Sequence, residues 1–150
     1  MVTEKFTVGI TPDARLIREE VFMQEQGYKH EFDELDNSLW TLVLYLDGTP
    51  ISTGRLKEID PETYQIERIA VRKQFRGMKV GSYTVKYLCN KALSLGARKC
   101  ILHAQADKVH FYETLGFKIR DGEIDFDEGN PHVWMYKVIV KSKRKFRVNY

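Results

Sequence analysis

Cysteine is scarce in this sequence, and its placement fits neither a disulfide framework nor a metal site. The chain has only 2 cysteines in 150 residues, Cys89 and Cys100, and they lie too far apart for a zinc-binding motif. None of the 4 histidines has a second histidine four residues away, the spacing that places two ligands on one helix face. We therefore predict no metal site, and we expect both thiols to be buried and reduced.

Long hydrophobic stretches are also missing. No apolar run approaches the roughly 20 residues that a membrane-spanning helix needs, so we predict no membrane association. The first residues, Met1 to Lys5, do not lead into the apolar segment of a secretory signal. We expect a cytoplasmic protein, and the length of 150 residues predicts a single domain over residues 1–150.

The net charge of +3 is small, but the charges are unevenly distributed. Residues 137–147 contain six cations and no acid, and could contact nucleic acid or form a solvated terminus. We predict no nucleic-acid partner, because zinc motifs and interleaved aromatic and basic residues are absent. The early loop from Glu31 to Asp36 is acidic, and either attracts a cationic ligand or is solvated at a helix end.

Hydrophobic periodicity and turn residues predict alternating strands and helices. Thr11-Pro12 predicts a helix start, Ile17 and Val21 mark its buried side, and Gly27 marks its end. Asp47-Gly48 predicts a tight hairpin. The predicted strands are residues 4–10, 39–46, 51–56, 66–71, 99–105, 117–126 and 132–140. After the helix that begins at Thr11, the remaining predicted helices are residues 81–95 and a short one through Phe111 and Tyr112.

The order of these elements, β-α-β-β-β-α-β-α-β-β, predicts an α/β (α+β) fold with helices on the faces of a mixed sheet. Residues 66–105 form a strand, a helix and a second strand, a unit that predicts a parallel, right-handed crossover. The helix of this unit carries apolar or small residues at alternating spacings of four and three, which predicts one buried face. These residues are Gly81, Val85, Leu88, Ala92 and Leu95.

The turn between this strand and this helix has the composition of a phosphate-binding loop. It reads Arg76-Gly77-Met78-Lys79-Val80-Gly81. The first N–H groups of a helix have no partner inside the helix and can therefore bind an anion. The alternative is a glycine turn that only begins a helix. About thirty residues later, Phe111-Tyr112 offers a phenol to the same ligand, or else forms an ordinary pair of core aromatics.

These segments resemble the GNAT superfamily, the acetyl-CoA-dependent N-acyltransferases. The resemblance extends over essentially the whole chain and is strongest over residues 66–117. Its strings are Ile69-Ala70-Val71, Arg76 to Gly81, Leu102-His103-Ala104-Gln105 and Phe111 to Phe117. Two further strings, Val21 to Gly27 and Pro131 to Met135, resemble the ElaA/YjcF-type bacterial branch. The resemblance implies a GNAT-type, mostly antiparallel central sheet with helices on both faces, and acetyl-CoA (coenzyme A) as co-substrate.

The resemblance also implies which residues bind the donor. The edge of the strand would pair with the pantetheine arm, and the helix start would bind the pyrophosphate. The predicted cofactor-binding residues are Ile69, Ala70, Val71, Arg76, Gly77, Met78, Lys79, Val80, Gly81, Ser82, Gln105 and Tyr112. The sequence departs from the family pattern at Lys79, where glycine is usual, at Lys108, where alanine is usual, and at Gln105, where many members have asparagine.

Acetyl transfer to an amine requires an acid for the leaving thiolate and a base for the amine. Tyr112 is the predicted acid, because a phenol keeps its proton at neutral pH. Glu67 is the first candidate base, and its alternative role is a salt bridge with Arg55. His103 is the second candidate base and His132 the third, each with a structural role as the alternative.

We therefore predict an N-acetyltransferase that moves the acetyl group from acetyl-CoA to a primary amine of a small molecule or peptide by direct attack. The alternative, motivated by Lys79 and Lys108, is a CoA-binding or interaction module that has lost catalysis. The loops that select an acceptor vary freely, so the sequence does not identify the amine. Trp40 and Trp134 either line the acceptor cleft or pack in the core. A homodimer, formed by pairing of an exposed final strand, is compatible with the sequence.

Overall fold

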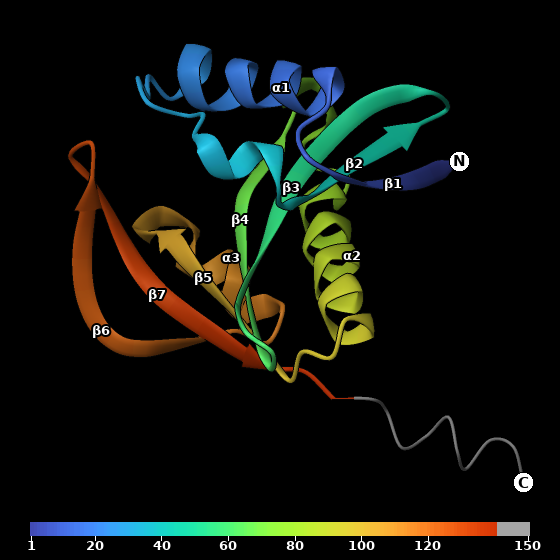
Figure 1. Ribbon diagram of the computed structural model, residues 1–150. Coiled ribbons are helices and arrows are strands. Elements are labelled where there is room, and N and C mark those ends of the chain that lie inside the picture. The colour runs from blue at the N-terminus through green and yellow to red at the C-terminus, as the bar shows by residue number, and fades with distance from the viewer. Residues whose placement is uncertain (141–150) are drawn as a thin grey trace, which may run out of the picture.

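The computed structural model describes residues 1–140, which form a sheet with helices packed against it (Figure 1). The strands are β1 (Val2–Val8), β2 (Trp40–Leu46), β3 (Thr49–Asp60), β4 (Thr63–Val71), β5 (Lys99–Gln105), β6 (Lys118–Asp127) and β7 (Asn130–Val138). The α-helices are α1 (Pro12–Arg18), α2 (Val80–Ser94) and α3 (Val109–Thr114), and a π-helix, η1 (Glu19–Glu25), continues α1. Three short 3-10 helices are η2 (Glu34–Asn37), η3 (Lys73–Phe75) and η4 (Ala106–Lys108). The predicted succession of strands and α-helices is confirmed.

The strands form one 7-stranded sheet in the order β1-β2-β3-β4-β5-β7-β6. Only β4 and β5 run parallel, and every other neighbouring pair is antiparallel, so the predicted mixed, mostly antiparallel sheet is confirmed. The parallel pairing is short and joins Thr63–Gln65 to Lys99–Ile101. Beyond these residues β4 and β5 no longer pair. The sheet therefore consists of a first arm, β1 to β4, and a second arm, β5 to β7.

Helices cover both faces of the first arm, as predicted. On one face, α1 and η1 pack Ile17 and Val21 against Val43 of β2. On the other face, α2 buries Val85 and Leu88 in the main core together with residues of β2, β3 and β4. Figure 1 shows α1 running across one side of the sheet and α2 standing against the other.

The first helix begins where the sequence predicts and changes its winding unexpectedly. Thr11 Oγ1 accepts a hydrogen bond from the N–H of Ala14 at 3.3 Å, and Pro12 occupies the first turn. The α-helix ends at Arg18, and the next 7 residues form the π-helix η1. The predicted helix from Thr11 to Gly27 is therefore confirmed in extent, and its second half is π-helical. Local residue preferences do not distinguish the two windings, and π-helical turns are often found at functional sites.

Other local predictions agree with the structure in most details. In α2 the predicted stripe is buried at Val85, Leu88 and Ala92, whereas Leu95 lies past the last turn and is 37% exposed. The turn between β2 and β3 has positive φ at Asp47 (48°) and Gly48 (86°), as a tight hairpin requires.

Cys89 and Cys100 are free and buried, which confirms that part of the prediction. No helix within residues 1–140 is long and apolar enough to cross a membrane. Most of the basic segment at residues 137–147 lies outside the described residues, and so do the alternatives considered for it.

Candidate functional site

A cavity of about 720 Å³ lies where the two arms of the sheet separate. Its walls come from β4, from β5 and β7 of the second arm, from the start of α2, and from the segment that begins in η1. A volume of this size is typical of sites for small molecules and cofactors. The described part of the chain contains no group of three or more metal-ligating side chains.

The strand β4 contains a bulge beside this cavity. Thr53 of β3 is paired with Ala70 and Arg55 with Glu67, so β4 has one residue more than β3 in this interval. Arg68 lies in the bulge with φ 55°, a left-handed conformation that few side chains adopt.

The other edge of β4 is open toward the cavity. No residue of β5 pairs with β4 beyond Gln65, so the peptide groups of residues 66–71 lack a neighbouring strand there. Such an edge can hydrogen-bond an extended, amide-containing ligand. The predicted edge residues Ile69, Ala70 and Val71 all line the cavity.

The loop before α2 forms part of the cavity wall. Gly77 has φ 83°, which glycine adopts without strain. No side chain within residues 1–140 caps the start of α2, where the first N–H groups lack intrahelical partners. Most of the predicted loop residues line the cavity, namely Gly77, Lys79, Val80, Gly81 and Ser82. Met78 does not: its side chain is 53% exposed, and the structure does not bring it to the cavity wall.

The second glycine of this loop permits close packing. A Cβ at Gly81 would lie 3.2 Å from Cζ of Phe111, so a larger residue would require the Phe111 ring to shift. Gly81 therefore allows the start of α2 to lie close to Phe111, on the helix that also carries Tyr112.

Lys79 occupies a backbone position that favours glycine. Its φ of 62° and ψ of 18° are left-handed, a conformation that costs an L-residue about 1–2 kcal/mol. The strain gives a physical reason for the glycine that the GNAT pattern has here. The Lys79 side chain is exposed at the rim of the cavity.

Arg76 lies in the cavity wall with its guanidinium already engaged. Both terminal nitrogens pair with Glu25 of η1, and Nη2 lies 2.6 Å from Oε1. Nε and Nη2 also donate to the carbonyl of Val71, at 3.0 and 2.9 Å. Hydrogen bonding to Arg76 lowers the pKa of Glu25 and raises that of Arg76. For the predicted phosphate contact, Arg76 must therefore either bind the phosphate and Glu25 together or break its ion pair with Glu25.

Tyr112 combines aromatic packing with a place in the cavity wall. Its ring lies edge-on to Phe111 and Phe117, with centroid distances of 5.1 and 6.0 Å. Burial raises the pKa of Tyr112 to about 12, so the phenol is protonated at neutral pH. This is the form that the predicted acid needs, and the assignment of Tyr112 as acid stays a prediction.

Glu67 lines the cavity and is held by an ion pair. Nε of Arg55 donates to its Oε1 at 3.0 Å, and Nη2 of Arg55 lies 2.9 Å from the same oxygen. Arg55 is only 2% exposed and also pairs with Asp33 and Asp36, at 2.8 and 2.9 Å. The salt bridge weighed as the alternative role is therefore present, and the role of Glu67 as base stays a prediction.

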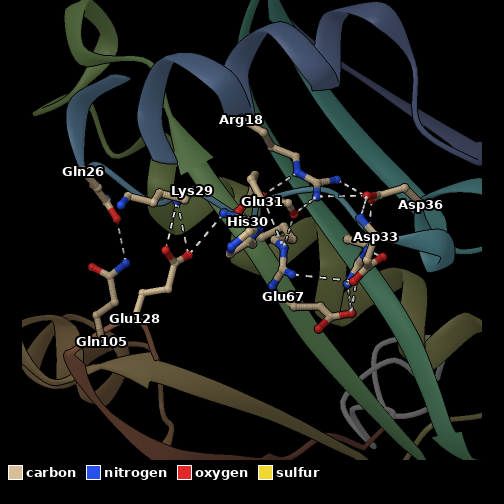
Figure 2. Close-up of polar contacts among 12 residues, drawn as sticks. Arg18, Gln26, Lys29, His30, Glu31, Asp33, Asp36, Glu67, Gln105 and Glu128 are labelled. Atoms are coloured by element: carbon tan, nitrogen blue, oxygen red, sulfur yellow. Dashed lines mark hydrogen bonds and ion pairs between the residues drawn. The ribbon is translucent and has the colours of Figure 1, made fainter. Parts of the chain in front are cut away.

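Two carboxylates of the acidic loop are buried in the same network (Figure 2). Arg18, 1% exposed, pairs with Glu31 at 2.8 Å and with Asp36 at 2.5 Å. Burial raises the pKa of Glu31 in spite of its arginine partners. Burial acts in the same direction on Asp36, but hydrogen bonds and the charges of Arg18 and Arg55 outweigh it and lower the pKa. Glu31 and Asp36 are therefore neither exposed carboxylates that attract a cation nor solvated residues at a helix end, and both predictions are wrong for them.

His103 lies in a stack of three rings on the second arm. Its ring centroid is 4.7 Å from that of His132 and 4.5 Å from that of Trp134, and all three residues line the cavity. Nε2 of His103 lies 3.3 Å from a carboxylate oxygen of Asp125 but has no aligned hydrogen-bond partner within residues 1–140. Burial and the neighbouring His132 lower the pKa of His103, which favours the neutral imidazole.

Trp40, the other tryptophan considered for the acceptor cleft, packs against the main core.

The sequence did not predict the roles of several residues in the cavity wall. These residues are Glu25, Gln26, Tyr28, His30 and Asp127. The string from Val21 to Gly27 carried a family resemblance but suggested no function. Asp127 lies about a hundred residues further along the chain, so no local pattern connects it to that string.

Charged side chains of both signs line the cavity. Lys79 and Lys108 have no ion pair within residues 1–140, whereas Arg76 is paired with Glu25. Glu31 and Glu67 are paired with arginines, and Asp127 has no ion pair within the described residues. The unpaired cations can contact the phosphates of a ligand, and the unpaired carboxylate can contact a cation.

Comparison with known proteins places this architecture among the acetyltransferases. Residues 9–117 match the model of the Acetyltransferase (GNAT) family. The uncharacterized N-acetyltransferase YjcF of Bacillus subtilis is 37% identical over 127 residues, which cover 83% of this chain and 90% of YjcF.

Solved structures show the same fold. The crystal structure of Escherichia coli ElaA has a TM-score of 0.79 at 22% identity and covers 91% of this chain and 99% of ElaA. A GNAT family acetyltransferase from Elizabethkingia anophelis, solved with acetyl-CoA bound, has a TM-score of 0.73 at 19% identity and covers 92% of this chain and 98% of that protein.

Proposed function

This chain belongs to the GNAT family of acetyltransferases, and on that basis we propose that it transfers the acetyl group of acetyl-CoA to a primary amine of a small molecule or peptide. The observation that carries the proposal is one cavity lined by the open edge of β4, the start of α2 and Tyr112. The relative from Elizabethkingia anophelis has acetyl-CoA bound, which supports the choice of donor. A cytoplasmic location and a homodimer remain predictions.

The residues of the cavity fit a CoA thioester. The N–H groups at the start of α2, with Lys79 and Lys108 nearby, suit the pyrophosphate. The open edge from Ile69 to Val71 suits the amides of the pantetheine arm. The bulge at Arg68 shifts the register between β4 and β3, and a backbone N–H near it would be the donor to the thioester oxygen.

The amine must lose a proton before it can attack. An alkylamine with a pKa of about 10.4 is neutral in only about one molecule in 2,500 at pH 7. Its nitrogen then forms a bond to the thioester carbon, and the carbon–sulfur bond breaks. The amine proton passes to a base, and the CoA thiolate takes up a proton or accepts a hydrogen bond.

His103 and Glu67 are the two candidate bases for the amine proton, which would reach them through water. Burial and then His132 lower the pKa of His103, which favours the neutral imidazole that a base needs. Glu67 is held by Arg55 at Oε1, and its Oε2 accepts a hydrogen bond from Nε2 of Gln65 at 3.4 Å. Tyr112, protonated at neutral pH, is the group for the thiolate.

A second candidate function follows from the engaged state of Arg76. If Glu25 holds this arginine permanently, and Lys79 strains the same loop, the chain would bind CoA weakly and without turnover. That protein would be a CoA-dependent interaction module with the GNAT fold.

The experiment that separates the two measures thiol release from acetyl-CoA over a panel of amines, aminosugars and peptides. Thermal melting with excess CoA is recorded in parallel. Saturable thiol release with at least one amine supports the acetyltransferase. A rise in melting temperature without thiol release supports the binding module, and the absence of any rise refutes the cofactor assignment.

A further inference from the structure

A segment of chain crosses between the two arms over the cavity, and we call residues 25–31 the strap. The carboxylate of Glu128, in the turn between β6 and β7, accepts hydrogen bonds from the strap (Figure 2). The N–H of Lys29 donates to its two oxygens at 3.1 and 3.3 Å, and the N–H of His30 donates at 3.3 Å. These bonds join parts of the chain that are 98 and 99 residues apart.

Further contacts hold the strap at both of its ends. Gln26 Oε1 accepts a hydrogen bond at 2.8 Å from Nε2 of Gln105, at the end of β5. On the first arm, Glu31 Oε2 lies 3.2 Å from Nε of Arg68 in the β4 bulge. The strap therefore spans the gap that the short β4–β5 pairing leaves open.

Glu128 has an unusual backbone for a glutamate. Its φ is 48°, in the left-handed region where asparagine, aspartate and glycine are the usual residues of such turns. Strained residues of this kind are found where a side chain has a positional task. The bonds from Lys29 and then His30 lower the pKa of Glu128, so its carboxylate is charged at neutral pH.

The neighbouring Asp127 adds a charge to the same part of the cavity. It lines the cavity wall and has no ion pair with any of residues 1–140. Glu67 and Glu31 line the same cavity, but arginines already pair with them. Asp127 is therefore the carboxylate available to a positively charged ligand.

We propose that the strap, held by Glu128, roofs the acceptor half of the cavity and restricts the acceptor to a compact, cationic amine. This inference rests on the proposed acetyl transfer. An extended peptide or a lysine of a folded protein would need an open groove where the strap crosses. A small amine fits beneath it, and Asp127 attracts its charge.

The substrate prediction is tested with amines matched in size. We expect 1,4-diaminobutane to be acetylated with a kcat/KM at least about tenfold above that of 4-aminobutyrate, whose second group is negative. Lysine-containing pentapeptides should be poorer still. Equal or better turnover of the peptides would overturn the inference and leave the acetyltransferase function standing.

The roof itself is tested with Glu128→Ala, with Glu123→Ala as the matched control. Glu123 is an exposed acid of the same hairpin whose side chain makes no hydrogen bond or ion pair within residues 1–140. We expect E128A to raise KM for the diamine about five- to tenfold, to leave CoA affinity unchanged, and to improve peptide turnover. E123A should match the wild type, and Glu128→Gln should fall between.

Hydrogen exchange gives a readout that does not depend on activity. The amides of Lys29 and His30 should exchange faster in E128A than in the wild type or E123A, while core amides of β3 remain unchanged. Unaltered exchange at these two amides would overturn the strap contact. If no amine is acetylated, the proposed function fails, and the exchange result still decides whether Glu128 holds the strap.

Discussion

Replacement of Lys79 by glycine separates the two effects that this residue has on the phosphate loop. The backbone of Lys79 is left-handed, with φ 62° and ψ 18°, and its side chain is exposed near the start of α2. Lys79→Gly removes the strain and the ammonium together. Lys79→Gln removes the ammonium and keeps the strain, so the pair of variants isolates each contribution.

The expected stabilisation follows from the backbone angles. Left-handed geometry costs a residue with a side chain about 1–2 kcal/mol. The greater flexibility of glycine in the unfolded chain offsets about 0.4–1 kcal/mol of the stabilisation gained by removing this strain. The net gain for K79G is therefore about 0.5–1 kcal/mol, which corresponds to a rise in Tm of about 1–4 °C for a chain of this size.

The expected effect on donor binding is unfavourable. The ammonium of Lys79 is exposed, so its contact with a phosphate is worth about 0.5–1 kcal/mol, or a two- to fivefold change in Kd. Both K79G and K79Q should weaken CoA binding by about that factor, more at low salt than at high salt.

Two assays decide the outcome. Thermal melting without ligand should rank K79G above the wild type and K79Q equal to it. Titration calorimetry with CoA should show the same loss in both variants. A K79G variant no more stable than the wild type would refute the strained backbone, and unchanged CoA affinity in both variants would refute the phosphate contact.

Three further predictions concern the acid, the base and the buried ion pairs. Tyr112→Phe should lower kcat about a hundredfold and leave CoA affinity within about twofold, whereas Tyr83→Phe, at an exposed tyrosine, should leave both unchanged; equal loss in the two variants would contradict the role of Tyr112. If His103 is the base, kcat/KM should stay constant as the pH falls to the ordinary histidine pKa of 6.5 and should decline only below it, because burial lowers the pKa of His103. If His103→Gln has the same pH profile as the wild type, His103 is excluded as the base. Asp36→Asn should reduce the free energy of unfolding in urea by about 3–5 kcal/mol, because Arg18 and Arg55 lose a buried partner. Glu34→Gln, an exposed acid of the same turn, should change it by less than about 0.5 kcal/mol.

The elements of this fold that depend on local pattern were predictable. Thr11 and Pro12 begin α1, Asp47-Gly48 turns β2 into β3, and the spacing of Val85, Leu88 and Ala92 makes one face of α2 buried. These features depend on residues close together in sequence, and the resemblance to a known family supplied their arrangement. Most of the residues predicted for the phosphate loop and the strand edge line one cavity for the same reason.

The ion pairs and the strap beside the cavity were predicted poorly because they depend on contacts between distant residues. Arg18 and Arg55 are charged residues that periodicity assigns to the surface, yet each is almost fully buried among carboxylates. Glu128 and Lys29 meet across 99 residues, and neither belongs to a recognisable motif. The change from α-helix to π-helix after Arg18 likewise has no residue that marks it.

The short pairing between β4 and β5 has a consequence for how the protein holds together. Within residues 1–140, strand pairing joins the two arms only between Thr63–Gln65 and Lys99–Ile101, so this junction is the narrowest part of the sheet. A thioester arm bound along β4 would act as a missing strand inserted beside that junction. Donor binding would then couple the two arms of the sheet. The two arms should therefore unfold more cooperatively when the donor is bound than when it is absent.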